Sequence, residues 1–234
     1  MLVHSLFDVL AWLSGGALAW WLHRRHLFGA APLPTLAGVP GYFVALSLGA
    51  VSGALAFGSL NLGLAGRSPL GHSIAGALAG GIAAVELYKL ARGMHGSTGL
   101  AFVAPLALGI AVGRLGCFFA GLPDYTYGIP TQVPWGVNFG DGVARHPVQV
   151  YETLAMLTFL CVFLRAAALR SEMVLRHGFY LFVAWYAAQR FLWEFLKPYP
   201  AILGQLNLFH LIAIALLVYS IIMMVRNHDV LARG

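Results

Sequence analysis

The chain has 234 residues, of which 60% are hydrophobic and only 9% are charged. Soluble globular domains carry roughly a quarter charged residues, so this composition excludes an ordinary soluble enzyme. The 28 glycines and 11 prolines lie within long apolar runs, which excludes intrinsic disorder. The net charge of +6 comes from Lys and Arg between those runs, so nucleic acid is not an expected partner. A polytopic protein of the lipid bilayer remains.

Seven segments approach the length needed to cross a hydrocarbon core, which is about 20 apolar residues for a core of about 30 Å. They predict an all-α fold in a single integral membrane domain, residues 1–234. The predicted spans are 5–22, 41–66, 72–89, 100–121, 148–164, 178–196 and 206–225.

The distribution of Lys and Arg predicts the orientation, because these residues collect on the cytoplasmic side of membrane proteins. The amino terminus is expected outside and the carboxyl terminus inside. One side carries nine of these residues: Arg24, Arg25, Lys89, Arg92, Arg165, Arg170, Arg176, Arg226 and Arg233. The other side carries three: Arg67, Arg145 and Lys197.

Two connections are long. The outer loop, residues 122–147, contains a Gly-Asp-Gly turn at 140–142, and residues 135–139 before it predict a short hairpin. The connection 24–40 is expected on the inner side. Cys117 and Cys161 are 44 residues apart in apolar runs, a spacing that fits neither a disulfide framework nor a zinc site. No metal or cofactor is expected.

Ionisable residues within spans mark candidate functional sites, because burying them in lipid costs free energy. Most of those in this chain fall toward the outer ends of the spans, which predicts one polar pocket opening into the outer leaflet. Arg190 and Glu194 are four residues apart and can pair on one helix face, which Tyr186 and Lys197 share. A purely structural ion pair is the alternative.

Two further placements follow from helical spacing. Arg114 and Cys117 share a face of the fourth span, whereas Glu86 and Lys89 lie at the inner end of the third and predict a solvated surface pair. Two arginines in an outer-leaflet pocket suit a phosphate, because the guanidinium fork binds its oxygens bidentately. In a membrane the abundant phosphate belongs to phospholipid headgroups, so the sequence predicts a lipid-handling protein.

Several motifs occur in the order found in one known family. They are Gly-Arg-Leu-Gly-Cys-Phe at 113–118, Arg-His-Pro-Val-Gln-Val-Tyr-Glu at 145–152, Tyr186 with Arg190 and Glu194, and Gly-Gln at 204–205. In these segments the chain resembles the bacterial prolipoprotein diacylglyceryl transferase family. The likeness extends over about residues 71–225 and is weak in the first two spans.

The resemblance implies a multi-pass enzyme of the bacterial plasma (inner) membrane with its active site facing the outer side. Such an enzyme transfers a diacylglyceryl group from phosphatidylglycerol to the lipobox cysteine of a prolipoprotein and releases glycerol phosphate. The resemblance implies catalytic roles for Arg114, Arg190, Glu194, His146 and Glu152. The substrate-binding candidates are Arg145, Gln149, Tyr151, Tyr186, Cys117, Asp124 and His72.

The chain also departs from the family pattern. Cys117 stands where the family has asparagine, and Leu122 replaces an acidic residue unless Asp124 substitutes for it. The His-Gly-Gly of the third span is absent, with only His72 nearby. The arginines that would hold the phosphate remain, so binding of phospholipid is better supported than the identity of the acceptor.

The transfer requires a thiolate nucleophile and hence a base. His146 and His72 are the candidates, with Glu152 or Asp124 to orient either one. For each histidine, a hydrogen bond at a helix terminus is the alternative. For Cys117, packing is favoured over a covalent role. Two other functions remain open: a paralogue that uses a different acceptor, and a non-enzymatic phospholipid-binding or transport protein.

Overall fold

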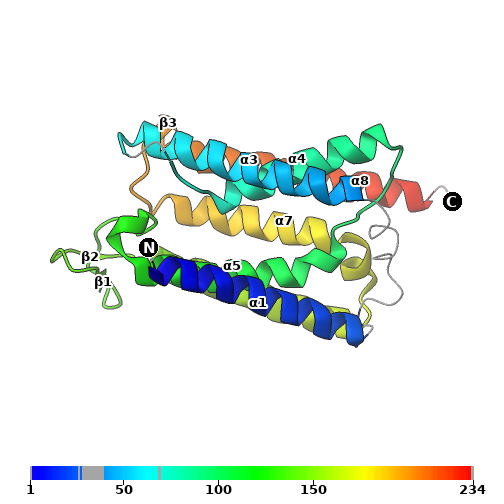
Figure 1. Ribbon diagram of the computed structural model, residues 1–234, viewed down its shortest axis with the longest axis horizontal. Helices are drawn as coiled ribbons and strands as arrows, with labels where there is room; N and C mark the ends of the chain where they lie inside the picture. Colours follow the sequence, from blue (N-terminus) through cyan, green and yellow to red (C-terminus); the bar gives the residue numbers. More distant parts are fainter. Residues whose placement is uncertain (1, 26, 28–39, 68–69, 233–234) are drawn as a thin grey trace. The chain divides into compact units, whose positions relative to one another are not determined.

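The computed structural model describes residues 2–25, 27, 40–67 and 70–232 (Figure 1). Within these ranges it contains seven long helices, which confirms the predicted all-α, seven-helix fold. They are α1 (Leu2–Arg24), α3 (Pro40–Leu64), α4 (Ile74–Ala91), α5 (Val103–Ala120), α6 (Val148–Ala168), α7 (Glu172–Glu194) and α8 (Leu208–Ala232). Most of the predicted inner connection, 24–40, lies outside the described residues.

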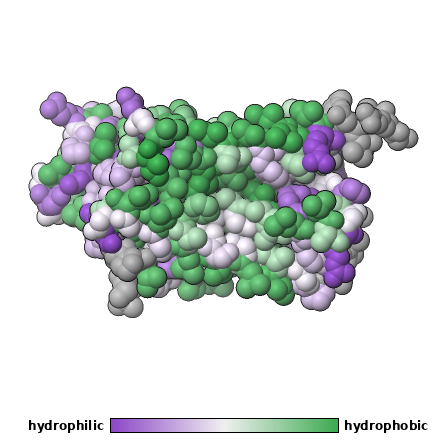
Figure 2. Space-filling view, turned by 90° about the horizontal axis from the view of Figure 1, so that it is seen from above, coloured by the Kyte–Doolittle hydropathy of each residue, from purple (hydrophilic) through white to green (hydrophobic). Residues whose placement is uncertain are grey.

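Six of these helices, all except α7, are long and apolar enough to cross a membrane. Hydrophobic side chains cover much of the face seen in Figure 2, as expected of helices that face lipid. Helix α7 begins six residues before the predicted span, because its first turns carry the charged residues Glu172 and Arg176. These pair across one helical turn at 3.8 Å, so a polar first turn continues the helix beyond its apolar stretch.

The helices belong to two compact units. The first unit comprises residues 1–29 and 99–198 and contains α1, α5, α6 and α7. The second comprises residues 30–98 and 199–234 and contains α3, α4 and α8. The single domain expected for residues 1–234 stays a prediction.

In the first unit, α1 packs along α5, α5 along α6, and α6 against α7. One end of this unit holds the first residues of α1 and α6 and the last residues of α5 and α7. The loop between α5 and α6 lies at the same end (Figure 1). Two short 3-10 helices, Leu100–Phe102 and Leu122–Asp124, flank α5. The topology therefore brings polar residues from four separate segments to one end of the unit.

The predicted hairpin forms in the loop between α5 and α6. Strand β1 (Val137–Asn138) pairs antiparallel with β2 (Ala144–Arg145). The Asn138 carboxamide oxygen accepts hydrogen bonds from the backbone amides of Gly140 and Gly142, at 2.8 and 3.0 Å. Both glycines have positive φ values, 105° and 81°, which explains the Gly-Asp-Gly sequence of the turn.

In the second unit, α3 and α4 approach closely enough for their backbones to touch. A Cβ atom built on Gly53 would lie 2.3 Å from the carbonyl oxygen of Gly76, and one on Gly49 would lie 2.5 Å from that of Gly80. Small residues at such interfaces let helices in membranes pack by van der Waals contact. This unit also holds the hairpin of β3 (Ala201–Leu203) and β4 (Leu206–Asn207), directly before α8.

We expect Gly53→Ala to destabilise the protein by about 1–3 kcal/mol, because its methyl group would force α3 and α4 apart. Gly63→Ala is the matched control on the same helix, where nothing lies within 4 Å of the added Cβ. It should be neutral, or stabilising by up to about 1 kcal/mol through helix propensity. Thermal unfolding in detergent compares the two variants, and equal stabilities would contradict the close packing of these helices.

The expectation of a solvated pair at the inner end of α4 is wrong. Lys89 is only 3% exposed, and its ammonium group donates to both carboxylate oxygens of Glu86, at 3.0 and 3.1 Å. Tyr219 of α8 donates its hydroxyl to the same carboxylate at 2.9 Å. The pair is therefore part of the packing between α4 and α8 within the second unit.

Candidate functional site

A cluster of five charged side chains lies at the polar end of the first unit, centred on Glu152 in the first turns of α6. Arg114 of α5 contacts one Glu152 oxygen through Nε at 3.0 Å. Arg190 of α7 donates to the other oxygen, which also accepts from the Lys197 ammonium group at 2.9 Å. Glu194 completes the cluster, 2.6 Å from Arg190 and 3.4 Å from Lys197.

These contacts confirm the predicted pair of Arg190 and Glu194 and show that it belongs to a larger cluster. All five residues are buried. Arg114 and Arg190 come from different helices, yet they meet at the same carboxylate. The cluster holds three cations against two carboxylates, so one positive charge is in excess. Charges that are taken out of water are stable only when they are paired or hydrogen-bonded, so a cluster with this formal charge is suited to bind an anion.

Buried groups beside the cluster retain hydrogen-bonding capacity. Tyr186 is 1% exposed and lies within electrostatic range of both Arg114 and Arg190. Within the described part of the chain, its hydroxyl has no hydrogen-bond partner, and neither has the side-chain oxygen of Gln149. A buried polar group without a partner costs about 1–3 kcal/mol, so these groups are suited to meet a polar ligand.

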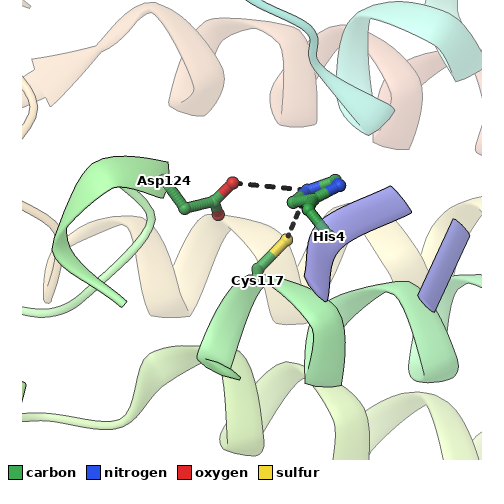
Figure 3. A group of neighbouring side chains, drawn as sticks. All are labelled: His4, Cys117 and Asp124. Atoms are coloured by element: carbon green, nitrogen blue, oxygen red, sulfur yellow. Dashed lines mark hydrogen bonds and ion pairs between the residues drawn. The ribbon is translucent and has the colours of Figure 1, made fainter. Parts of the chain in front are cut away.

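A second group, which sequence reasoning missed in part, consists of His4, Cys117 and Asp124 (Figure 3). His4 Nε2 is 3.3 Å from Asp124 Oδ1 and 3.8 Å from Cys117 Sγ. Arg114 Nη1 donates to the same sulfur at 3.9 Å, so the two groups are neighbours. The one local signal for His4 is its spacing of four residues from Asp8, whose carboxylate contacts His4 Nδ1 at 2.9 Å.

Asp124 links this second group to α6. Thr126 donates its hydroxyl to Asp124 at 2.6 Å and accepts from the Gln149 amide at 3.3 Å. Burial alone would raise the pKa of the Asp124 carboxyl, but hydrogen bonds from His4 and Thr126 outweigh it and hold that pKa below its ordinary value. Asp124 is therefore a carboxylate at neutral pH. It lies beside Cys117 and His4, and its role as the substitute for the family's acidic residue stays a prediction.

Two other predicted residues lie in the aromatic part of the loop. His146 Nδ1 is 3.3 Å from the Tyr151 hydroxyl, which accepts a hydrogen bond from Trp135 Nε1 at 2.7 Å. Arg145 instead binds Asp141 within the hairpin through both of its terminal nitrogens, each at 2.7 Å, and lies over the ring of Tyr127. The structure thus gives His146 and Tyr151 a shared hydrogen bond and pairs Arg145 with a loop carboxylate.

His72 is the remaining predicted residue. It belongs to the second unit, just before α4, so its proposed place in the site stays a prediction. The sequence analysis noted Lys197 only as a neighbour on the face of Arg190. The structure shows it buried within the cluster, because the segment after α7 brings the ammonium group to Glu152.

The fold and the site together define a multi-pass membrane protein that holds a buried, net-cationic cluster at one end of a helical unit. Comparison with known proteins identifies the class further. The chain belongs to the prolipoprotein diacylglyceryl transferase family, whose model matches residues 10–226. This match confirms the resemblance drawn from the motifs, and it extends into the first two helices.

Three bacterial relatives show how far the similarity reaches, and each is named phosphatidylglycerol–prolipoprotein diacylglyceryl transferase. The protein of Geobacter sulfurreducens is 42% identical over 106 residues, which are 44% of this chain and 39% of the relative. That of Bordetella parapertussis is 37% identical over 147 residues, 58% of this chain and 52% of the relative. That of Idiomarina loihiensis is 33% identical over 173 residues, 70% of this chain and 63% of the relative.

The matched stretch thus spans about half the length of these relatives. No solved structure matches the chain.

Proposed function

We propose that this protein transfers a diacylglyceryl group from phosphatidylglycerol to the lipobox cysteine thiol of a prolipoprotein and releases glycerol phosphate. The observation that carries the proposal is the convergence of Arg114 and Arg190 on one buried carboxylate, in a cluster with one positive charge in excess. The names of the bacterial relatives supply the reaction and both substrates.

The lipid phosphate would be held by the two arginines. A guanidinium group has five N–H donors, and Arg114 directs its Nε to Glu152 and one Nη1 donor to Cys117. Its other donors can serve a phosphate oxygen, and the excess charge of the cluster favours the phosphate electrostatically. Tyr186 adds a hydroxyl donor beside both arginines. Glu194 would act by positioning Arg190 rather than by touching the lipid.

The reaction is a displacement at the glycerol carbon that bears the phosphate. The acceptor thiol loses its proton, and its sulfur attacks that carbon. The carbon–sulfur bond forms as the carbon–oxygen bond to the phosphate breaks, and the electron pair leaves with glycerol phosphate. Arg114 and Arg190 would stabilise the charge that grows on the leaving phosphate, in a site where burial strengthens each contact.

The base that accepts the thiol proton would be His146, which is partly buried and contacts the Tyr151 hydroxyl. Imidazole titrates near neutral pH, which suits this role. His72 is the second candidate. Arg145 in the loop and Gln149 at the start of α6 are proposed to contact the substrates.

The site would face the outer side of the bacterial inner membrane, with the amino terminus outside. The excess of Lys and Arg in the opposite set of connections supports this orientation.

The test is incubation of the purified protein with phosphatidylglycerol in mixed micelles and a lipobox peptide. The proposal predicts that the peptide gains the mass of one diacylglyceryl unit and that an equal amount of glycerol phosphate appears. If glycerol phosphate appears but the peptide is not modified, the protein is instead a paralogue that uses another acceptor. If neither product appears, the function that remains is that of a phospholipid-binding or transport protein.

A further inference from the structure

The side chains of His4, Cys117 and Asp124 place three metal-ligating atoms of different chemistry around one point in the first unit (Figure 3). The three atoms lie within 4.8 Å of one another, although His4 and Cys117 are 113 residues apart in the chain. We propose that these residues bind a zinc ion with three protein ligands and one open coordination position.

The spacing of the donor atoms fits tetrahedral zinc. With Zn–N and Zn–O bonds near 2.0 Å and a Zn–S bond near 2.3 Å, a tetrahedral ion separates nitrogen from oxygen by about 3.3 Å and nitrogen from sulfur by about 3.5 Å. The corresponding distances here are 3.3 Å from His4 Nε2 to Asp124 Oδ1 and 3.8 Å from His4 Nε2 to Cys117 Sγ. Two of the three separations are thus close to those of a tetrahedral ion, and the third, between Cys117 Sγ and an Asp124 carboxylate oxygen, is at most 4.8 Å.

The hydrogen-bond partner of the His4 ring supports the same assignment. A histidine that binds a metal through one nitrogen usually donates the N–H of its other nitrogen to a carboxylate, which fixes the ring and its tautomer. His4 has this arrangement, because Asp8 Oδ2 lies 2.9 Å from His4 Nδ1, opposite the face that meets Cys117 and Asp124. Asp8 is thus a positioning residue for the site.

The donor set indicates which metal. Mg²⁺ and Ca²⁺ take oxygen ligands, whereas zinc accepts a mixture of imidazole, thiolate and carboxylate. One thiolate and one carboxylate would neutralise the two charges of the ion. The spacing of the two cysteines argued against zinc, but this site uses only Cys117.

Binding of the ion stands on this geometry alone, whereas its role rests on the proposed function. Three protein ligands and an open position are the arrangement of catalytic zinc sites. An acceptor thiol that entered the open position would lose its proton to the base of the proposed reaction more readily, since a coordinating thiol is deprotonated. The nucleophile would then lie beside Arg114, which holds the lipid phosphate in the proposed reaction.

The experiment uses the full chain in detergent micelles, purified without a polyhistidine tag, stripped with a chelator and titrated with zinc chloride. Metal content after gel filtration should reach one zinc per chain in the wild type. His4→Ala, Cys117→Ser and Asp124→Asn should each lose it. Cys161→Ser is the matched control, because this other free cysteine lies apart on α6, and it should retain one zinc. Asp8→Asn should bind zinc about 10- to 100-fold more weakly.

Cobalt supplies a readout that does not depend on any variant. The wild type loaded with Co²⁺ should show the absorption of a thiolate-to-cobalt charge transfer in tetrahedral geometry. Its absence, or equal zinc content in the wild type and in folded Cys117→Ser, would overturn the site. Metal binding without transfer to the peptide would contradict the proposed function and leave the site standing. Full transfer by the metal-free protein would overturn the role of the ion in activating the thiol.

Discussion

Replacing Arg190 with alanine is expected to lower the rate of diacylglyceryl transfer by about 10²- to 10³-fold, the loss typical when one donor to a developing negative charge is removed. Arg190 binds both carboxylates of the buried cluster, so the variant would leave two cations facing Glu152 and Glu194. The excess positive charge disappears, and with it the attraction for the phosphate. The initial rate of peptide modification in phosphatidylglycerol micelles measures the effect.

Two control variants separate charge from geometry. Arg190→Lys restores the charge without the planar fork, so we expect a rate between those of the wild type and Arg190→Ala. Arg176→Ala removes an arginine from the exposed first turns of the same helix and should leave the rate unchanged. Equal rates for the wild type and a folded Arg190→Ala variant would contradict the proposed role of Arg190.

The largest effect on stability is expected for Glu152→Gln. Glu152 is 1% exposed, and its carboxylate receives contacts from Arg114, Arg190 and Lys197. Its loss would leave three buried cations with Glu194 as the one carboxylate of the cluster. Breaking a buried ion pair by removing one partner costs about 3–5 kcal/mol, because the remaining charge stays desolvated. Denaturation in detergent micelles, followed by the loss of helical circular dichroism, measures the difference.

Glu172→Gln is the matched control for this prediction. Glu172 also pairs with an arginine, but its side chain is 83% exposed and lies 3.8 Å from Arg176. Exposed pairs contribute roughly 0–1 kcal/mol, so this variant should unfold almost as the wild type does. A stability of Glu152→Gln equal to that of Glu172→Gln would show that the cluster does not hold α5, α6 and α7 together.

The sequence predicted those parts of the molecule that depend on local pattern. Apolar length located the seven helices, the Gly-Asp-Gly turn located the hairpin, and helical spacing placed Arg190 beside Glu194. The start of α7 escaped prediction because its first turns are polar, and hydropathy reports contact with lipid rather than backbone conformation.

What the sequence could not supply were contacts between distant segments. The burial of Lys89 depends on packing within the second unit, where Tyr219 of α8 meets the paired Glu86. The position of His4 depends on how α1 packs along α5, which no local pattern encodes. Helical spacing could assign Arg114 and Arg190 only to a face of the helix that each belongs to. Only the packing of α5, α6 and α7 showed that both reach one carboxylate.

In the proposed function, Arg114 and Arg190 together hold one phosphatidylglycerol molecule. Native mass spectrometry of the delipidated protein, after addition of phosphatidylglycerol, counts bound lipids directly. We predict one tightly retained lipid in the wild type and in Arg176→Ala, and its loss in both Arg114→Ala and Arg190→Ala. Retention of that lipid by either folded variant of the cluster, or no retained lipid in the wild type, would contradict the claim.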